Sequence, residues 1–75
     1  YYNRGLARVN RGDFRGAVDD FSAAISINKK DADSWYNRGL AWYYLNDTKN
    51  ACSDMRISKS FGDRQAYTFM KKYCK

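Results

Sequence analysis

The chain has 75 residues, of which 44% are hydrophobic and 17% aromatic, and its formal net charge is +6. This composition suits one small folded domain and is too apolar for a disordered tail. With no histidine and two cysteines, the chain lacks the usual base of a catalytic triad and the ligand spacing of a metal site. It also has no run of 18 apolar residues. We therefore expect no membrane insertion and no cofactor.

Apolar residues recur at steps of three and four through most of the chain, which is the period of an amphipathic helix. The absence of proline fits a helical protein, and aspartates stand where helices should begin. The expected N-cap residues are Asp13, Asp33 or Ser34, and Asp63. The five expected helices span about residues 1–11, 14–28, 34–45, 48–60 and 63–74.

The six letters YNRGLA occur at residues 2–7 and again at residues 36–41, which is a spacing of 34 residues. Aligning residues 1–34 with 35–68 gives eleven identities, six in the hexamer and five beyond it. The five further identities are at Asp13, Ala17, Asp20, Ser26 and Ala32. Because they are spread through the whole unit, the sequence contains an internal repeat rather than one duplicated hexamer.

A helix–turn–helix unit of 34 residues resembles the tetratricopeptide repeat (TPR) family. The residues that match or replace the family motif are Tyr1, Gly5, Ala17 and Phe21 in the first unit, and Trp35, Gly39, Trp42, Ala51 and Met55 in the second. The resemblance implies an all-α solenoid of antiparallel helix pairs, with repeats at 1–34 and 35–62 and a capping helix at 63–75. The closing phrases ACSDMRISKSFGD and KKYCK are similar to the C-terminal ends of bacterial TPR proteins.

The resemblance also implies a function, because TPR arrays are non-catalytic scaffolds that hold a peptide or partner helix in a concave groove. Family geometry assigns to this groove the residues Tyr2, Asn3, Tyr36, Asn37, Leu40, Tyr43, Tyr44, Tyr67 and Met70. The tyrosines would serve as apolar anchors. Asn3 and Asn37 would bind the backbone of an extended segment, since a side-chain amide both donates and accepts.

The positive charge supports an alternative, in which Arg4, Arg8, Arg11 and Arg15 form a basic stripe that binds nucleic acid or another anionic surface. A solvated basic surface explains these residues more simply. An enzyme is the weakest hypothesis, because the sequence has no nucleophile motif, phosphate loop or metal set.

Two charge pairs recur at matching positions of the two units, Arg4 with Asp20 and Arg38 with Asp54. We expect each to join the two helices of its repeat, because a buried arginine needs a partner. For the two cysteines we expect free buried thiols, with a disulfide as the alternative if the protein is exported. Two repeats fall short of the three usually needed, so we expect further repeats upstream or self-association.

Overall fold

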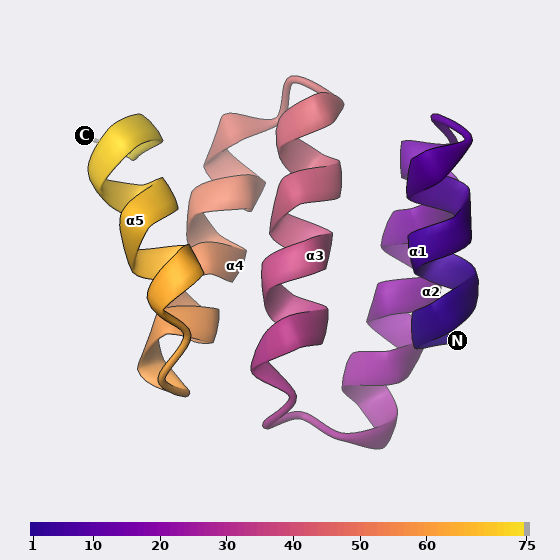
Figure 1. Cartoon of the computed structure of the whole chain (residues 1–75), viewed down its shortest axis with the longest axis horizontal. Helices are drawn as coiled ribbons and strands as arrows, with labels where there is room; N and C mark the ends of the chain where they lie inside the picture. The colour runs from indigo at the N-terminus through magenta and orange to yellow at the C-terminus, as the bar shows by residue number, and fades with distance from the viewer. Residues whose placement is uncertain (75) are drawn as a thin grey trace.

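A computed structural model describes residues 1–74 of the chain, and within this range it contains five helices and no strand. The helices are α1 (Tyr2–Asn10), α2 (Phe14–Ile27), α3 (Ala32–Tyr44), α4 (Thr48–Ser60) and α5 (Arg64–Tyr73). They form a row of antiparallel neighbours in two layers, with α1, α3 and α5 in one layer and α2 and α4 behind them (Figure 1). The all-helical solenoid expected from the sequence is confirmed.

Aspartates begin four of the five helices. Each accepts a hydrogen bond from a backbone amide of the first turn, which would otherwise lack a partner. These N-cap residues are Asp13, Asp31, Asp47 and Asp63. The expectation that Asp33 or Ser34 caps the third helix was wrong. The helix begins two residues earlier, at Ala32, because the side chain of Asp31 accepts from the backbone amide of Asp33 and from the hydroxyl of Ser34.

The core contains two apolar clusters, one where α2 meets α3 and one where α4 meets α5. The first contains Ala17, Val18, Phe21 and Ala41, and the second contains Ala51, Met55, Ala66 and Phe69. Trp42 packs against both clusters and so joins the two repeats. This arrangement explains why the short chain holds together: the second unit buries its α3 against α2 of the first unit.

Gly5 on α1 lies against the ring of Phe21 on α2. A Cβ atom at this position would lie 2.7 Å from Cε1 of Phe21, a ring that is fully buried. The matching Gly39 would place its Cβ 3.0 Å from Cε of Met55 and 3.2 Å from the carbonyl oxygen of Ala51. Glycine in the repeated hexamer therefore allows the close contact between the two helices of each repeat.

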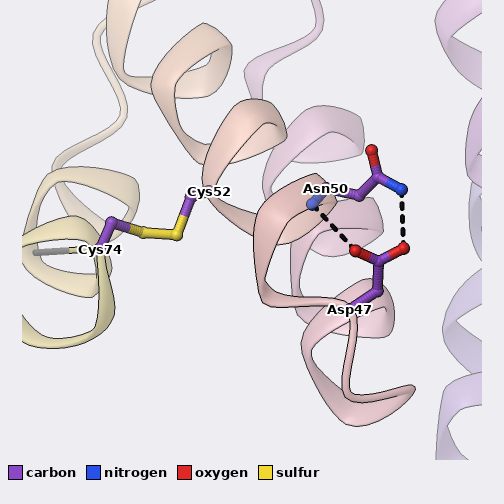
Figure 2. The surroundings of a disulfide bond; sticks show 4 residues. All are labelled: Asp47, Asn50, Cys52 and Cys74. Carbon is purple, nitrogen blue, oxygen red and sulfur yellow. Dashed lines mark hydrogen bonds between the residues drawn. A yellow bond between two sulfur atoms is a disulfide. The ribbon is translucent and has the colours of Figure 1, made fainter.

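Cys52 on α4 and Cys74, directly after α5, are joined by a disulfide, with their Cα atoms 5.8 Å apart (Figure 2). The expectation of two free thiols was therefore wrong. Both cysteines are half-buried where α5 packs on α4, so their side chains face each other across this helix pair. The bond closes the end of α5 onto α4, and Cys74 itself packs against the second apolar cluster.

Candidate functional site

The structure brings together the members of both expected ion pairs. The guanidinium of Arg38 donates to both carboxylate oxygens of Asp54, from Nε at 2.8 Å and from Nη2 at 2.9 Å. Arg4 and Asp20 make the matching contact in the first repeat, with Nη2 2.8 Å from Oδ1. In both pairs the aspartate is buried in the second helix of its repeat. These pairs fix the two helices of each repeat in one register.

The matching arginines of the two repeats, Arg4 and Arg38, differ in their contacts and in their exposure. Nη1 of Arg38 reaches back to α2 and donates to the hydroxyl of Ser22 at 3.0 Å, so this side chain connects three helices. The side chain of Arg38 is 20% exposed, whereas that of Arg4, at the open edge of the row, is 57% exposed. Arg38 therefore also ties the second repeat to the first.

Arg8 occupies the repeat position of Trp42 but makes polar contacts within its own repeat. Its Nη1 atom donates to Asp13 at 2.7 Å, and its Nε atom lies 2.9 Å from Oδ2 of Asp20. Hydrogen bonds from Arg4 hold the pKa of Asp20 below its ordinary value, and the nearby charge of Arg8 adds to this effect. The basic stripe proposed for α1 is thus partly neutralised, because Arg4 and Arg8 are both engaged with aspartates.

Asn37 connects α3 to α1 on the face formed by α1, α3 and α5, which we call the odd-helix face. Its amide nitrogen donates to the hydroxyl of Tyr2 at 3.1 Å and to the carbonyl oxygen of Asp33 at 2.9 Å. Both amide hydrogens are therefore used within the protein, and the side-chain oxygen of Asn37 remains as an acceptor. The matching Asn3 is exposed, so its amide is accessible to a partner.

Aromatic rings extend across α3 towards both of its neighbours. Tyr43 packs edge-on against Phe69 of α5, with ring centroids 5.4 Å apart. It also contacts the ring of Tyr73, with centroids 4.9 Å apart. In the other direction, Tyr44 stacks on Phe14 at the start of α2, with centroids 4.9 Å apart. Desolvation raises the pKa of Tyr43, and the neighbouring Tyr73 adds to the shift. Several expected groove tyrosines thus pack against the protein itself.

A hollow of about 360 Å³ lies between α3 and α5. Its lining residues are Tyr36 from α3 and Arg64, Gln65, Thr68, Phe69, Lys72 and Tyr73 from α5. Burial raises the pKa of the Tyr36 hydroxyl, and the carboxylate of Asp63 contributes further. The lining combines aromatic rings, two cations and two neutral polar groups, which is the composition of a site that takes an apolar group and orients it.

Several expected groove residues lie elsewhere. Leu40 and Met70 pack against the second apolar cluster. Tyr67 does not line the hollow; its ring lies beside Lys59 and Lys71, with the ammonium nitrogens 5.2 and 5.6 Å from the ring centroid. The side chain of Tyr2 packs against Phe21, with ring centroids 5.8 Å apart. Of the nine expected groove residues, Tyr36 is the one that lines the hollow.

The register of α5 explains why the sequence did not point to the α5 residues that line the hollow. The N-caps Asp13 and Asp47 are 34 residues apart, but Asp31 and Asp63 are only 32 apart. The link before α5 is therefore two residues shorter than the repeat predicts. Thr68, rather than Met70, takes the position that Tyr36 has on α3. This distance depends on Asp31, which was not among the helix caps expected from the sequence, so the register that places Thr68 beside Tyr36 was missed with it.

The family model of the TPR repeat matches residues 5–46, which is more than half of the chain. The chain therefore belongs to the TPR repeat family, whose members generally mediate protein–protein interactions and typically act as non-catalytic scaffolds. An uncharacterized protein of Methanocaldococcus jannaschii is 39% identical to the chain over 41 residues, which are 55% of this chain and 48% of that protein. The match thus spans about half of that relative's length.

Neither a membrane-spanning helix nor a metal-ligand cluster occurs among residues 1–74. None of the helices there is long and apolar enough to cross a membrane. The same residues include no group of three or more His, Cys, Asp or Glu side chains that could hold a metal ion.

Proposed function

We propose that the odd-helix face binds an extended segment of a partner protein, and that the hollow between α3 and α5 receives one apolar side chain of that segment. The observation that carries this proposal is the position of the hollow. It opens beside Tyr36, one residue before Asn37, whose side-chain oxygen is left as an acceptor. A peptide amide could therefore bind next to an anchored side chain.

Tyr36 is the expected anchor contact. It is partly buried, so its ring is held in place by the protein and loses little freedom when a ligand covers it. Asn3 and Asn37 would fix the backbone of the segment while reading little of its sequence. Because most contacts would be to the backbone of the segment, we expect the site to tolerate varied sequences. The expected affinity is on the order of micromolar, or about −8 kcal/mol.

The experiment is a titration of peptides that are first selected on the immobilised protein from a displayed library. Tyr36→Ala should weaken binding by about 2 kcal/mol if Tyr36 is a hot spot. Lys49→Gln is the control, because Lys49 is exposed on α4 and does not line the hollow. Peptides that bind Tyr36→Ala and Asn37→Ala as tightly as the unaltered protein would show that another surface is responsible.

The division into repeats at 1–34 and 35–62 and a capping helix at 63–75 is part of the same proposal. It assigns α3 and α5 to different units and places the hollow between them. Binding on the basic stripe of α1 is the competing outcome of the experiment. It would appear as a loss of binding in Arg11→Gln and Arg15→Gln with Tyr36→Ala unaffected.

A further inference from the structure

We infer that the segment bound between α3 and α5 is acidic, with two carboxylates that flank the anchored apolar side chain. This inference rests on the proposed function and names the chemistry of the partner. It begins from the distribution of charge. Residues 48–75 carry seven Lys and Arg and two Asp, a net charge of +5, whereas residues 1–47 carry seven and six, a net charge of +1. Nearly all of the net charge therefore lies in the last two helices.

Arg64 and Lys72 place part of this charge at the hollow. Both side chains are exposed, both line the hollow, and neither forms an ion pair within residues 1–74. The ammonium of Lys72 lies over the ring of Tyr73, 5.4 Å from its centroid. Two cations without a carboxylate partner beside an apolar hollow attract a ligand that supplies the carboxylates.

One acid, Asp63, lies near the hollow, but within residues 1–74 it forms no ion pair with Arg64 or Lys72. The side chain of Asp63 is engaged at the start of α5, where it accepts from the amide of Gln65 at 2.9 Å and from the hydroxyl of Ser58 at 3.0 Å. These contacts hold its oxygens at the helix end. Among the lining residues themselves there is no Asp or Glu, so the charge presented to a ligand is positive.

The spacing of the two cations sets the pattern of the ligand. Arg64 and Lys72 are eight residues apart on one face of α5, which corresponds to about 12 Å along the helix axis. In an extended segment, residues i and i+4 lie on the same side and are about 13 Å apart. Residue i+2 lies on that side between them. We therefore expect Asp or Glu at the first and fifth positions and an apolar side chain at the third.

Phe69 and Tyr73 are placed to receive that third side chain. They line the hollow together with Tyr36, and their rings lie 4.7 Å apart. Gln65 and Thr68 also line the hollow: Gln65 offers a side-chain amide to the segment's backbone, and the Thr68 hydroxyl, which donates to the carbonyl oxygen of Arg64, offers an acceptor. The site thus accepts an apolar group in its middle and a negative charge at each end.

The test is selection from a displayed library of internal 12-residue peptides, so that no free C-terminal carboxylate is present. Enrichment of acidic residues four positions apart around an apolar residue supports the inference. Synthetic blocked peptides then provide the measurement: Gly-Glu-Ser-Leu-Ser-Glu-Gly and its Gln-for-Glu counterpart. The acidic peptide should bind about tenfold more tightly at low salt, and the difference should shrink in about 0.5 M salt.

Variants locate the effect. Arg64→Gln and Lys72→Gln should each remove about threefold of the preference for the acidic peptide, measured as the ratio of the affinities of the acidic and the neutral peptide for the same variant. Lys49→Gln and Arg56→Gln remove the same charge from exposed positions on α4 that do not line the hollow, and they should keep most of the preference. An acidic preference that survives Arg64→Gln and Lys72→Gln would overturn the inference.

The remaining outcomes separate this inference from the function on which it rests. Selected peptides that need Tyr36 but show no acidic preference would overturn the inference and leave the proposed function standing. If no selected peptide depends on Tyr36, both fail. An oligonucleotide that binds more tightly than every peptide, and loses affinity in Arg64→Gln, would overturn the inference in favour of nucleic acid.

Discussion

Arg38 and Asp54 form a two-point contact across the second repeat, with donor–acceptor distances of 2.8 and 2.9 Å. Only 6% of the Asp54 side chain and 20% of the Arg38 side chain are exposed, so water replaces little of this contact if one partner is removed. The planar fork of arginine suits both carboxylate oxygens at once, and its third nitrogen binds Ser22. One side chain therefore fixes the geometry of two repeats.

Asp54→Ala should lower the free energy of unfolding by about 2 kcal/mol, less than for a fully buried pair because Arg38 retains some contact with water. The double variant Arg38→Leu/Asp54→Ala should recover most of this loss, since it leaves no unpaired charge and leucine packs well between helices. Urea denaturation measures all three proteins. A loss below about 0.5 kcal/mol for Asp54→Ala would show that the pair contributes little.

The first repeat should give the protein an acid-sensitive stability. Hydrogen bonds from Arg4 lower the pKa of Asp20, and hydrogen bonds from the Gly16 amide and from Arg8 lower the pKa of Asp13. A depressed folded-state pKa stabilises the protein above the unfolded value of about 3.9, and this stabilisation is lost as the pH falls through the folded value. Stability should therefore decline below about pH 4.

Asp20→Asn separates this contribution from general acid unfolding. The stability difference between this variant and the unaltered protein should be complete above about pH 5 and should shrink as the pH falls below about 4. Asp19→Asn changes the same charge at an exposed neighbouring position and controls for net charge. A difference for Asp20→Asn that stays constant down to pH 2 would contradict the assignment.

The sequence was sufficient for the fold because its signals are periodic and local. Helical stripes and a duplicated hexamer define the five helices and their pairing, and these do not depend on any single loop. The site was harder to predict, because the hollow depends on the link before α5. A link two residues shorter than the period turns Phe69 and Tyr73 towards Tyr36 and leaves Tyr67 beside Lys59.

Two further differences have equally local causes. Ser34 looked like a helix cap because of its hydroxyl, but Asp31 lies three residues earlier. The carboxylate of Asp31 accepts hydrogen bonds from the backbone amide of Asp33 and from the hydroxyl of Ser34. The cysteines gave no pairing signal in the sequence, because their separation of 22 residues says nothing about distance until α5 is folded back on α4.

Glycine-to-alanine substitutions at Gly5 and Gly16 should have different effects. At Gly5 the new methyl group meets the buried ring of Phe21, which has no space to move, so the cost of overpacking exceeds the gain in helix propensity. At Gly16 the new group meets Arg8 and the N-cap carboxylate of Asp13, both of which can turn towards solvent; this weakens the cap of α2, but the gain in helix propensity offsets the loss. Gly5→Ala should cost about 1 to 2 kcal/mol and Gly16→Ala should stay within about 0.5 kcal/mol.

Thermal denaturation of the two variants tests this pair directly, since they differ only in where one methyl group is added. Gly39→Ala extends the comparison, because its Cβ would meet the flexible tip of Met55 as well as a backbone oxygen. The loss of stability in Gly39→Ala should lie between the losses in Gly5→Ala and Gly16→Ala. Equal losses at Gly5 and Gly16 would mean that helix propensity or the cap, rather than the contact with Phe21, decides the effect.

Reduction of the disulfide should lower both stability and ligand affinity. Opening a loop with a sequence separation of 22 residues removes about 3 kcal/mol of stabilisation through the unfolded chain. The bond holds the end of α5, and α5 supplies six of the seven residues that line the hollow, Tyr36 being the seventh. Looser attachment of α5 should therefore weaken a peptide selected on the oxidised protein. By reciprocal linkage, the same peptide should make the disulfide harder to reduce.

Hydrogen exchange, thermal denaturation and peptide titration, each with and without dithiothreitol, measure these effects. Exchange should increase first in α5 and last around Phe21, which is fully buried in the first repeat. The double variant Cys52→Ser/Cys74→Ser is the control. Its melting temperature and peptide affinity should equal those of the reduced protein and should not change when dithiothreitol is added. Loss of stability without any change in peptide affinity would mean that the packing of Ala66 and Phe69 alone keeps α5 in place. An unchanged melting temperature on reduction would show that the bond adds nothing to the fold.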